Sequence, residues 1–471
     1  MIRIIYLFLI CTTIVAQSNF DQSVLKYKID KLLKDLPRGS KTSAIIYDPL
    51  TKDTMYSYNI LDPKTPASNV KLYTTAAALN LLGPEFLLST QIFTDDINLL
   101  DSVINGNLVI KGFGNSIFAD STLDSLVNEI KLLGIKHIEG NIIGDDSNFD
   151  TYYLRDDWIV GEAANVPLPP ISALVVNRNQ FKLIVDCSGE IGTKPTLTSN
   201  PNGTFIEFKN ETIISDKNDI KITNSSVTDT SIIVSVKGKI KKSNTPKSYT
   251  VFAENPPLYA ALLLKSNLET AGIKVDGKAK INQKLIQYYP LFSSSIKLKD
   301  LIKPINKNSD NFLAECLFKE LGAFYSGSIG NSFYATQAVL NFCEENDIDT
   351  ELISIVDGSG ISRFNKLTIK SLVSLLEKIY FNDELFPYFL SSLAVSGVDG
   401  TLEDRMIETA AEFNFRGKTG TLNGVSSIAG FLSTKSNNDM IVVILMEFNR
   451  KGANYYRNIQ DKIIGLCAEM L

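Results

Sequence analysis

The sequence predicts a mixed α/β fold of the α+β kind, in which one antiparallel sheet packs against helices and a large inserted domain interrupts the chain. Three observations lead to this prediction. Strand-like runs follow one another at 415–425, 426–432 and 440–446, and a helical pattern closes the chain at 455–471. Short strands and turns begin near residue 85. Helical patterns resume at 298, as expected when the chain returns to the first core.

Length and composition allow more than one core. The chain has 471 residues, of which 44% are hydrophobic and 21% are charged, so two or three domains are expected. The 47 basic and 52 acidic residues give a net charge of -5. This near balance produces no field strong enough to attract a polyanion, so nucleic acid is excluded as a partner.

The first 16 residues have the pattern of a secretory signal peptide. Arg3 is followed by an apolar run at 4–10 and by small or β-branched residues up to Ala16. The apolar run is short for a membrane span, which needs ~20 residues. The prediction is a signal peptide at 1–16 and an exported, periplasmic mature chain. Peripheral association with the membrane stays open.

Cysteine and histidine usage limits the chemistry. Cys187, Cys316, Cys343 and Cys467 form no Cys-x-x-Cys pair, so a zinc site is not expected, and a bridge between Cys316 and Cys343 is left open. The chain has a single histidine, His137, between a helical run and a strand-like run. A metal site built on several histidines is excluded, and no metal or organic cofactor is expected. If the protein is a hydrolase, its base is expected to be another residue.

Local patterns predict the elements in order. A helix at 21–35 precedes a hairpin with strands at 43–48 and 54–58. A helix at 70–82 stops at Gly83-Pro84, which places Ser68 at its start. Further helices are expected at 257–271, 298–305, 312–321, 332–345 and 369–380. The predicted domains are a catalytic domain at 17–84 and 293–471 and an inserted domain at 85–292, with a β-rich module nested at 187–250.

Ser68 and Lys71 are candidates for a nucleophile and its base. Three residues apart on a helix, their side chains share one face, so the amine can reach the hydroxyl. For Lys71 to accept a proton near neutral pH its pKa must fall below the reference of ~10.4. Burial, or a neighbouring cation such as Lys418, would lower it. Alone, the Ser-x-x-Lys pattern is common, because serine is favoured at helix starts.

Two further motifs complete a candidate site. Ser309 can relay a proton to a leaving amine, and Asn311 can donate a hydrogen bond to a substrate carbonyl while holding Lys71. Lys418 and Thr419 would bind a carboxylate. Gly420 lets a substrate backbone lie against the strand. The backbone N–H groups of Ser68 and Thr421 would form the oxyanion hole.

The order Ser-x-x-Lys, Ser-Asp-Asn and Lys-Thr-Gly resembles the signature of penicillin-binding proteins and serine β-lactamases. Ser309 follows Ser68 by 241 residues and precedes Lys418 by 109. The long first gap resembles the class C low-molecular-mass penicillin-binding proteins, the D-alanyl-D-alanine carboxypeptidase/endopeptidase family of the DacB type. The stretches 357–365, 394–402, 418–425, 140–146 and 171–177 are also similar to it.

The resemblance implies a transpeptidase-like catalytic domain, with Ser68 as acylated nucleophile and Lys71 as base. Ser309 and Asn311 would form a second wall, and Lys418 with Thr419 the carboxylate clamp. It also implies that Arg363 and Asn423 lie near the bound stem peptide, and that an acid of the inserted domain, Asp145 or Asp146, meets the amine of a diamino acid. Asn423 stands where some relatives carry glutamine.

The activity implied is cleavage of D-Ala-D-Ala ends or D-Ala-diaminoacid cross-bridges in peptidoglycan through an acyl-enzyme. Peptidoglycan stem peptides would be the substrates, and β-lactam antibiotics would be covalent inhibitors that acylate Ser68. Two alternatives stay open at this point. One is a β-lactamase, which would deacylate rapidly, and the other is a catalytically silent protein that binds the cell wall.

Overall fold

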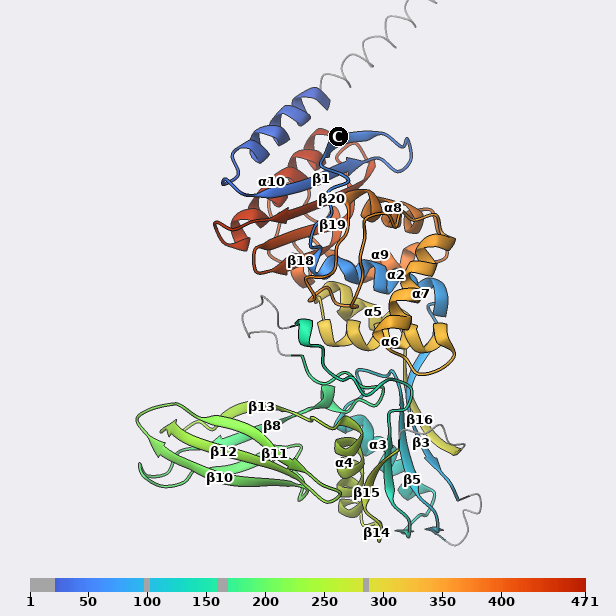
Figure 1. Cartoon of the computed structure of the whole chain (residues 1–471), viewed down its shortest axis with the longest axis vertical. Helices are drawn as coiled ribbons and strands as arrows, with labels where there is room; N and C mark the ends of the chain where they lie inside the picture. The colour runs from blue at the N-terminus through green and yellow to red at the C-terminus, as the bar shows by residue number, and fades with distance from the viewer. Residues whose placement is uncertain (1–21, 97–101, 159–167, 283–287) are drawn as a thin grey trace, which may run out of the picture.

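The computed structural model describes residues 22–96, 102–158, 168–282 and 288–471. The predicted signal peptide at 1–16 lies outside the described residues. In Figure 1 both ends of the described chain belong to the upper part of the molecule, and the middle of the chain builds the lower part. Among the residues described, no helix is long and apolar enough to cross a membrane.

A six-stranded antiparallel sheet forms the centre of the upper part, in the order β17-β18-β19-β20-β1-β2. Its strands are β1 (Lys41–Tyr47), β2 (Thr54–Tyr58), β17 (Ala394–Val395), β18 (Phe415–Leu422), β19 (Val425–Ser433) and β20 (Asp439–Glu447). β1 pairs with β20 along its whole length, so the beginning and the end of the chain close one sheet. The prediction of an antiparallel sheet packed against helices is confirmed.

Helices cover both faces of this sheet (Figure 1). Side chains alternate along β20, so that Val442 and Ile444 join the core under α10 (Ala453–Met470) and the helix at 22–34, while Ile441 and Val443 join the opposite core. The second core contains α2 (Val70–Leu82), α5 (Leu298–Lys307), α6 (Asn311–Ser326), α7 (Ser332–Glu345), α8 (Ile369–Tyr380) and α9 (Phe386–Ser392). α2 lies within this layer and contacts α5, α6 and α7.

Most helix bounds agree with the patterns in the sequence. α2, α7 and α8 begin and end at the expected residues, and α2 stops at Gly83, whose φ of 81° only glycine adopts readily. Short elements that were not expected include α9 and the 3-10 turn η4 (Gly400–Leu402), because each is too short to show a periodic pattern.

The lower part contains a five-stranded mixed sheet in the order β15-β7-β5-β3-β16. Its strands are β3 (Leu87–Thr94), β5 (Leu108–Phe113), β7 (Ile142–Asp145), β15 (Ala279–Asn282) and β16 (Tyr289–Lys297). α4 (Pro256–Thr270) packs on β7 and β15, and α3 (Asp120–Leu132) contacts α4 and β16. The chain leaves the upper part through β3 and returns through β16, and these two strands pair with each other.

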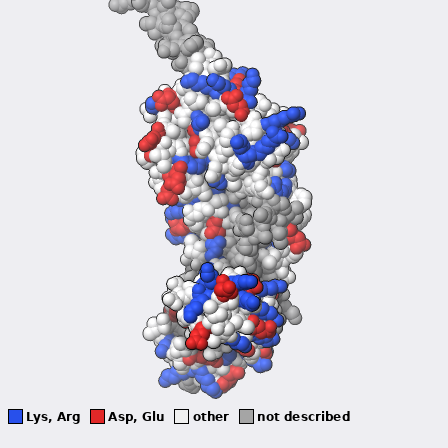
Figure 2. All heavy atoms as spheres, turned by 90° about the vertical axis from the view of Figure 1, so that its left-hand side faces the viewer, with Lys and Arg blue, Asp and Glu red and all other residues white. Residues whose placement is uncertain are grey.

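Three small sheets complete the lower part. One is parallel and joins β4 (Val103–Ile104), β6 (His137–Ile138) and β14 (Lys274–Val275). The others are β10-β12-β11 and β13-β8-β9. Their strands are β8 (Gln180–Asp186), β9 (Thr196–Asn200), β10 (Ile206–Ser215), β11 (Lys221–Val227), β12 (Ile232–Lys241) and β13 (Lys247–Phe252). Figure 2 shows basic and acidic side chains interspersed over the face that it presents.

The predicted domain boundaries stay a prediction. β16 runs past residue 292, and β8 begins before residue 187. The four cysteines of the described chain are buried and free, so Cys316 in α6 and Cys343 in α7 are two separate thiols. His137 lies in β6 and its ring lies 2.7 Å from a carboxylate oxygen of Asp276.

Candidate active site

The turn that carries Ser68 is held tightly between two other segments. Ser68 lies in the 3-10 turn η1 (Ala67–Asn69), directly before α2, and Ala67 has a left-handed φ of 50°. A Cβ atom added at Gly360 would lie 2.0 Å from the Ala67 carbonyl oxygen, and one at Gly420 would lie 2.7 Å from the Pro66 carbonyl oxygen. These close backbone approaches give the serine a rigid support.

Lys71 lies at the centre of a hydrogen-bond network beside Ser68. Its Nζ atom lies 2.9 Å from Ser68 Oγ, 2.7 Å from Asn311 Oδ1 and 2.5 Å from the Ser359 carbonyl oxygen. The side chain is fully buried. Burial lowers the pKa of Lys71 to about 8, against the opposing effect of nearby carboxylates. A substantial fraction of this amine is therefore neutral near physiological pH.

Two buried carboxylates shape the loop that faces Lys71. Glu315 Oε1 accepts a hydrogen bond of 2.7 Å from the Ser359 N–H, and Asp357 Oδ1 accepts one of 2.8 Å from the Gly360 N–H. The indole N–H of Trp158 donates to Asp357 Oδ2 at 3.2 Å. Burial raises the pKa of Glu315 to about 7 and also raises that of Asp357. Together these contacts aim the Ser359 carbonyl at the lysine.

Sequence reasoning did not single out Glu315 or Trp158. Glu315 lies in a helix among Leu313, Ala314 and Cys316, all of which are buried. An acid within such an apolar run is the signal that could have found it, because a carboxylate is rarely buried without a partner. The sequence around Trp158 carries no comparable signal, since its role depends on a hydrogen bond to Asp357, which is 199 residues away in the sequence.

The Ser309-Asp310-Asn311 segment forms the opposite wall. Ser309 has a left-handed φ of 59°, and the Asp310 side chain caps α6 by accepting from Leu313 N–H at 3.0 Å. Arg178 donates two hydrogen bonds to the Asp310 carboxylate, at 2.8 and 2.9 Å. The cap and the arginine fix the backbone so that Asn311 Oδ1 reaches Lys71.

Strand β18 presents its alternate side chains on two sides. Lys418 is fully buried, and its Nζ donates to the Thr419 carbonyl oxygen at 2.7 Å. Burial, together with the charge of Lys71, lowers the pKa of Lys418 well below its usual range. Thr419 and Thr421, two residues apart, share the other side. The Thr419 hydroxyl contacts that of Thr401 at 2.8 Å, and Thr421 Oγ1 accepts from Arg457 at 2.9 Å.

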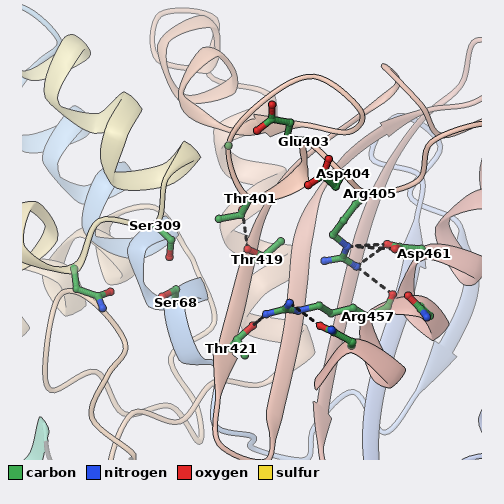
Figure 3. Close-up of a pocket in the computed structure, with 14 residues that line it drawn as sticks. Ser68, Ser309, Thr401, Glu403, Asp404, Arg405, Thr419, Thr421, Arg457 and Asp461 are labelled. Atoms are coloured by element: carbon green, nitrogen blue, oxygen red, sulfur yellow. Dashed lines mark hydrogen bonds and ion pairs between the residues drawn. The ribbon is translucent and has the colours of Figure 1, made fainter. Parts of the chain in front are cut away.

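These residues meet at a cavity of about 810 Å³ (Figure 3). Ser68 and Ser309 line one end, Thr419 and Thr421 line the strand edge, and Asn311 is also a lining residue. The remaining lining residues are Gly400, Thr401, Glu403, Asp404, Arg405, Asn454, Arg457, Asn458 and Asp461. The structure thus brings the three sequence motifs, which lie far apart in the chain, to one cavity.

Arg363 and Asn423 lie together but outside that cavity. The Arg363 guanidinium donates to the Asn423 backbone carbonyl at 2.6 Å. Both residues line a second cavity of about 390 Å³, with Lys41, Lys366 and Glu447 among its other lining residues. Their contact with a stem peptide stays a prediction.

Asp146 is almost fully buried in the lower part of the molecule. Its Oδ2 atom accepts from the Tyr153 hydroxyl at 2.8 Å and from the Ser172 hydroxyl at 3.0 Å. Burial raises the pKa of Asp146. The neighbouring Asp145 pairs with Lys111 at 3.2 Å. Neither acid lines the cavity around Ser68, so recognition of a diamino acid by Asp146 stays a prediction.

Within the part of the chain that the structure describes, no cluster of three or more His, Cys, Asp or Glu residues could hold a metal ion. The chemistry that the described residues support is that of a hydroxyl nucleophile beside an amine base.

The model of the D-Ala-D-Ala carboxypeptidase 3 (S13) family matches residues 25–470. The D-alanyl-D-alanine carboxypeptidase DacB of Haemophilus influenzae is 27% identical over 86% of this chain and 85% of its own length. The D-alanyl-D-alanine carboxypeptidase of Actinomadura sp. strain R39 is also 27% identical, over 87% of this chain and 78% of its own.

Solved structures agree with this result. The crystal structure of penicillin binding protein 4 (dacB) from Haemophilus influenzae aligns with a TM-score of 0.81 and 25% identity, covering 94% of this chain and 99% of that one. The same protein in complex with a β-lactam aligns with a TM-score of 0.75 and 25% identity, over 92% of this chain and 97% of that one.

Proposed function

The chain belongs to the D-Ala-D-Ala carboxypeptidase 3 (S13) family of serine-type peptidases, and from this premise we propose that it cleaves D-Ala-D-Ala ends and D-Ala-diaminoacid cross-bridges of peptidoglycan through an acyl-enzyme on Ser68. We include export to the periplasm in this proposal, on the N-terminal pattern of residues 1–16.

Acylation begins with Lys71 in its neutral form. Lys71 Nζ takes the hydroxyl proton of Ser68 while Oγ bonds to the carbonyl carbon of the penultimate D-alanine. The backbone N–H groups of Ser68 and Thr421 stabilise the oxyanion. The C–N bond then breaks, and the leaving amine takes a proton that passes from Lys71 through the Ser309 hydroxyl. The products are an ester on Ser68 and the leaving amine, which is free D-alanine from a D-Ala-D-Ala end or the diamino acid of the second stem peptide from a cross-bridge.

Deacylation uses water as the second nucleophile. Lys71 accepts a proton from the water, hydroxide adds to the ester carbon, and the C–O bond to Ser68 breaks as the serine recovers its proton. Asn311 holds Lys71 through Oδ1 at 2.7 Å and keeps its amide N–H groups for the substrate carbonyl. Thr419, which lines the cavity, contacts the carboxylate of the substrate, and Lys418 on the other side of β18 contributes its charge. Gly420 lets β18 approach the turn that carries Ser68.

The observation that carries the proposal is the environment of Lys71. This amine is fully buried, lies 2.9 Å from Ser68 Oγ and has a pKa lowered to about 8. General bases work best when their pKa lies near the operating pH. A lysine that only stabilised the fold would favour a carboxylate partner, yet Lys71 contacts a hydroxyl, an amide oxygen and a backbone carbonyl.

Intact-mass measurement with a fluorescent penicillin tests the nucleophile. We expect a stable adduct on the mature chain that maps to Ser68 and is absent from Ser68→Ala. D-Ala release from a pentapeptide ending in D-Ala-D-Ala, measured on the same samples, tests the peptidase activity. Ser396→Ala is the matched control, since Ser396 is buried and does not line the cavity, and its hydroxyl donates to the Ala411 carbonyl and accepts from Phe415 N–H.

Two outcomes would favour the alternatives. Rapid hydrolysis of the penicillin without an accumulating adduct would indicate a β-lactamase. Neither adduct nor hydrolysis, with no release of D-Ala, would contradict the proposal and favour a silent wall-binding protein. Incubation with soluble cross-linked dimers of peptidoglycan stem peptides then separates the two activities by mass. Carboxypeptidase activity releases D-alanine from the dimer, and endopeptidase activity converts the dimer into monomers.

A further inference from the structure

The Arg457 guanidinium is a partly buried charge that faces the cavity. It donates to Thr421 Oγ1 at 2.9 Å and to Asn454 Oδ1 at 3.0 Å. It forms no ion pair with a carboxylate of the described residues, whereas its neighbour Arg405 pairs with Asp461 at 2.6 Å. The oxygens of Thr421 and Asn454 are uncharged and do not neutralise the charge of a partly buried guanidinium. This position therefore favours an anionic ligand.

The position of Arg457, on α10 beside Thr421 of β18, indicates which anion it would meet. Thr419 and Thr421 point to the same side of the strand, and both line the cavity together with Arg457. Figure 3 shows the Arg457 side chain reaching from α10 to Thr421, on the strand that carries Thr419. A carboxylate held by the two threonine hydroxyls would therefore have this guanidinium beside it.

The cavity also continues beyond the threonines. The leaving-group arm, as we name it, is the part lined by Thr401, Glu403, Asp404, Arg405, Asn454, Arg457, Asn458 and Asp461. It lies between η4 and the first turns of α10 (Figure 3). The whole cavity of about 810 Å³ falls in the range of pockets that bury drug-sized molecules, about 300–1,000 Å³. A leaving D-alanine offers only a methyl group to this space.

We propose that the leaving-group arm is the subsite for the amino acid that departs on acylation. Arg457 acts there as a specificity-determining residue that recognises the free α-carboxylate of that amino acid together with Thr419 and Thr421. The space beyond accepts side chains much larger than methyl. The ligand class is a D-configured residue with a free α-carboxylate, including the diamino-acid end of a cross-bridge. This inference rests on the proposed function and names its leaving-group selectivity.

Paired substrates test the carboxylate contact. One peptide ends in D-Ala-D-Ala with a free carboxylate, and the other carries the same sequence as its C-terminal amide. For Arg457→Gln we expect kcat/KM on the carboxylate peptide to fall about 10- to 100-fold, as for loss of one charge-assisted hydrogen bond. The amide peptide should change less than threefold. Arg457→Lys keeps the charge and should recover part of the loss.

A peptide ending in D-Ala-D-Lys tests the room in the arm. The wild-type enzyme should cleave it with a kcat/KM within threefold of that for D-Ala-D-Ala. A fall of more than tenfold would show that the arm is closed to larger leaving groups and would overturn that part of the inference.

Arg450→Gln is the matched control, because Arg450 is an exposed arginine that precedes the same helix. It should leave both peptides unchanged. If Arg457→Gln lowered kcat/KM equally on the carboxylate and the amide peptide, Arg457 would have a structural role through Thr421. If kcat/KM fell on neither peptide, Arg457 would not take part in recognising the substrate. Failure of the wild-type enzyme to cleave any D-Ala-D-Xaa peptide, with no penicillin adduct, would instead contradict the proposed function.

Discussion

The rate at which a penicillin acylates Ser68 should rise steeply between pH 7 and pH 9. In the proposed mechanism the base is neutral Lys71, whose pKa burial lowers from 10.5 to about 8. With that pKa, about one tenth of the molecules carry the neutral amine at pH 7 and about nine tenths at pH 9, which predicts a roughly ninefold increase. At the ordinary pKa only about three molecules in ten thousand would carry it at pH 7.

Stopped-flow fluorescence with a reporter penicillin measures the second-order acylation constant, which reports groups of the free enzyme. A falling rate over pH 7–9 would refute the assignment, because it would indicate loss of the positive charge on Lys418 rather than activation of Lys71. A flat profile would refute it as well, since no base would then titrate in that window.

A second perturbation tests the cause of the pKa. The Glu315 carboxylate is one of the groups that raise the pKa of Lys71. Glu315→Gln removes that charge and should move the rising limb to lower pH. The amide oxygen can still accept from Ser359 N–H, so the loop keeps its shape. A shift to higher pH would contradict the electrostatic reasoning.

Three further changes have defined outcomes. Arg178→Ala should slow acylation about 10-fold, because it removes the ion pair with Asp310 that holds the segment before α6. Lys319→Ala removes a different ion pair of α6 and should not slow it. Equal acylation rates for the two variants would refute the positioning role of Arg178. Gly420→Ala should abolish acylation, because the added Cβ would lie 2.7 Å from the carbonyl oxygen of Pro66, directly before the turn that carries Ser68. Gly452→Ala should leave the acylation rate unchanged, because its Cβ would have no atom within 4 Å. Burial raises the pKa of Glu320 from 4.5 to about 7, so its cost to stability grows as pH rises through this window. Glu320→Gln should therefore raise the free energy of unfolding in urea by up to about 3 kcal/mol at pH 8 and not at pH 4, and an equal gain at both values would contradict this.

Local patterns explain how far the secondary structure could be predicted. α2 and α8 have the bounds that apolar spacing and, for α2, the glycine after it indicate. The long pattern of α10 was also expected, although it begins two residues earlier, at Ala453. α9 and η4 were missed because one or two turns show no period.

The candidate site was only partly visible in the same way. Ser68 and Lys71 are neighbours on a helix, so their spacing alone brings the two side chains together. The chemistry of Asn311 and Lys418 suggested their roles, but no local rule joins residues more than 200 positions apart, and the resemblance to a family was what supported placing them in one site. Asp146 was placed by the same resemblance, and in the structure it is buried under Tyr153 and Ser172.

By itself the sequence determined which groups can react, the elements that carry them and the family to which the chain belongs. These depend on residue type and on spacing within a few turns of the chain. Only the tertiary structure decided that Lys71 is buried away from solvent, that Glu315 and Trp158 shape the loop facing it, and that Arg457 lies beside Thr421. Desolvation and long-range contact depend on what surrounds an atom in space, and that environment exists only once distant segments have packed together.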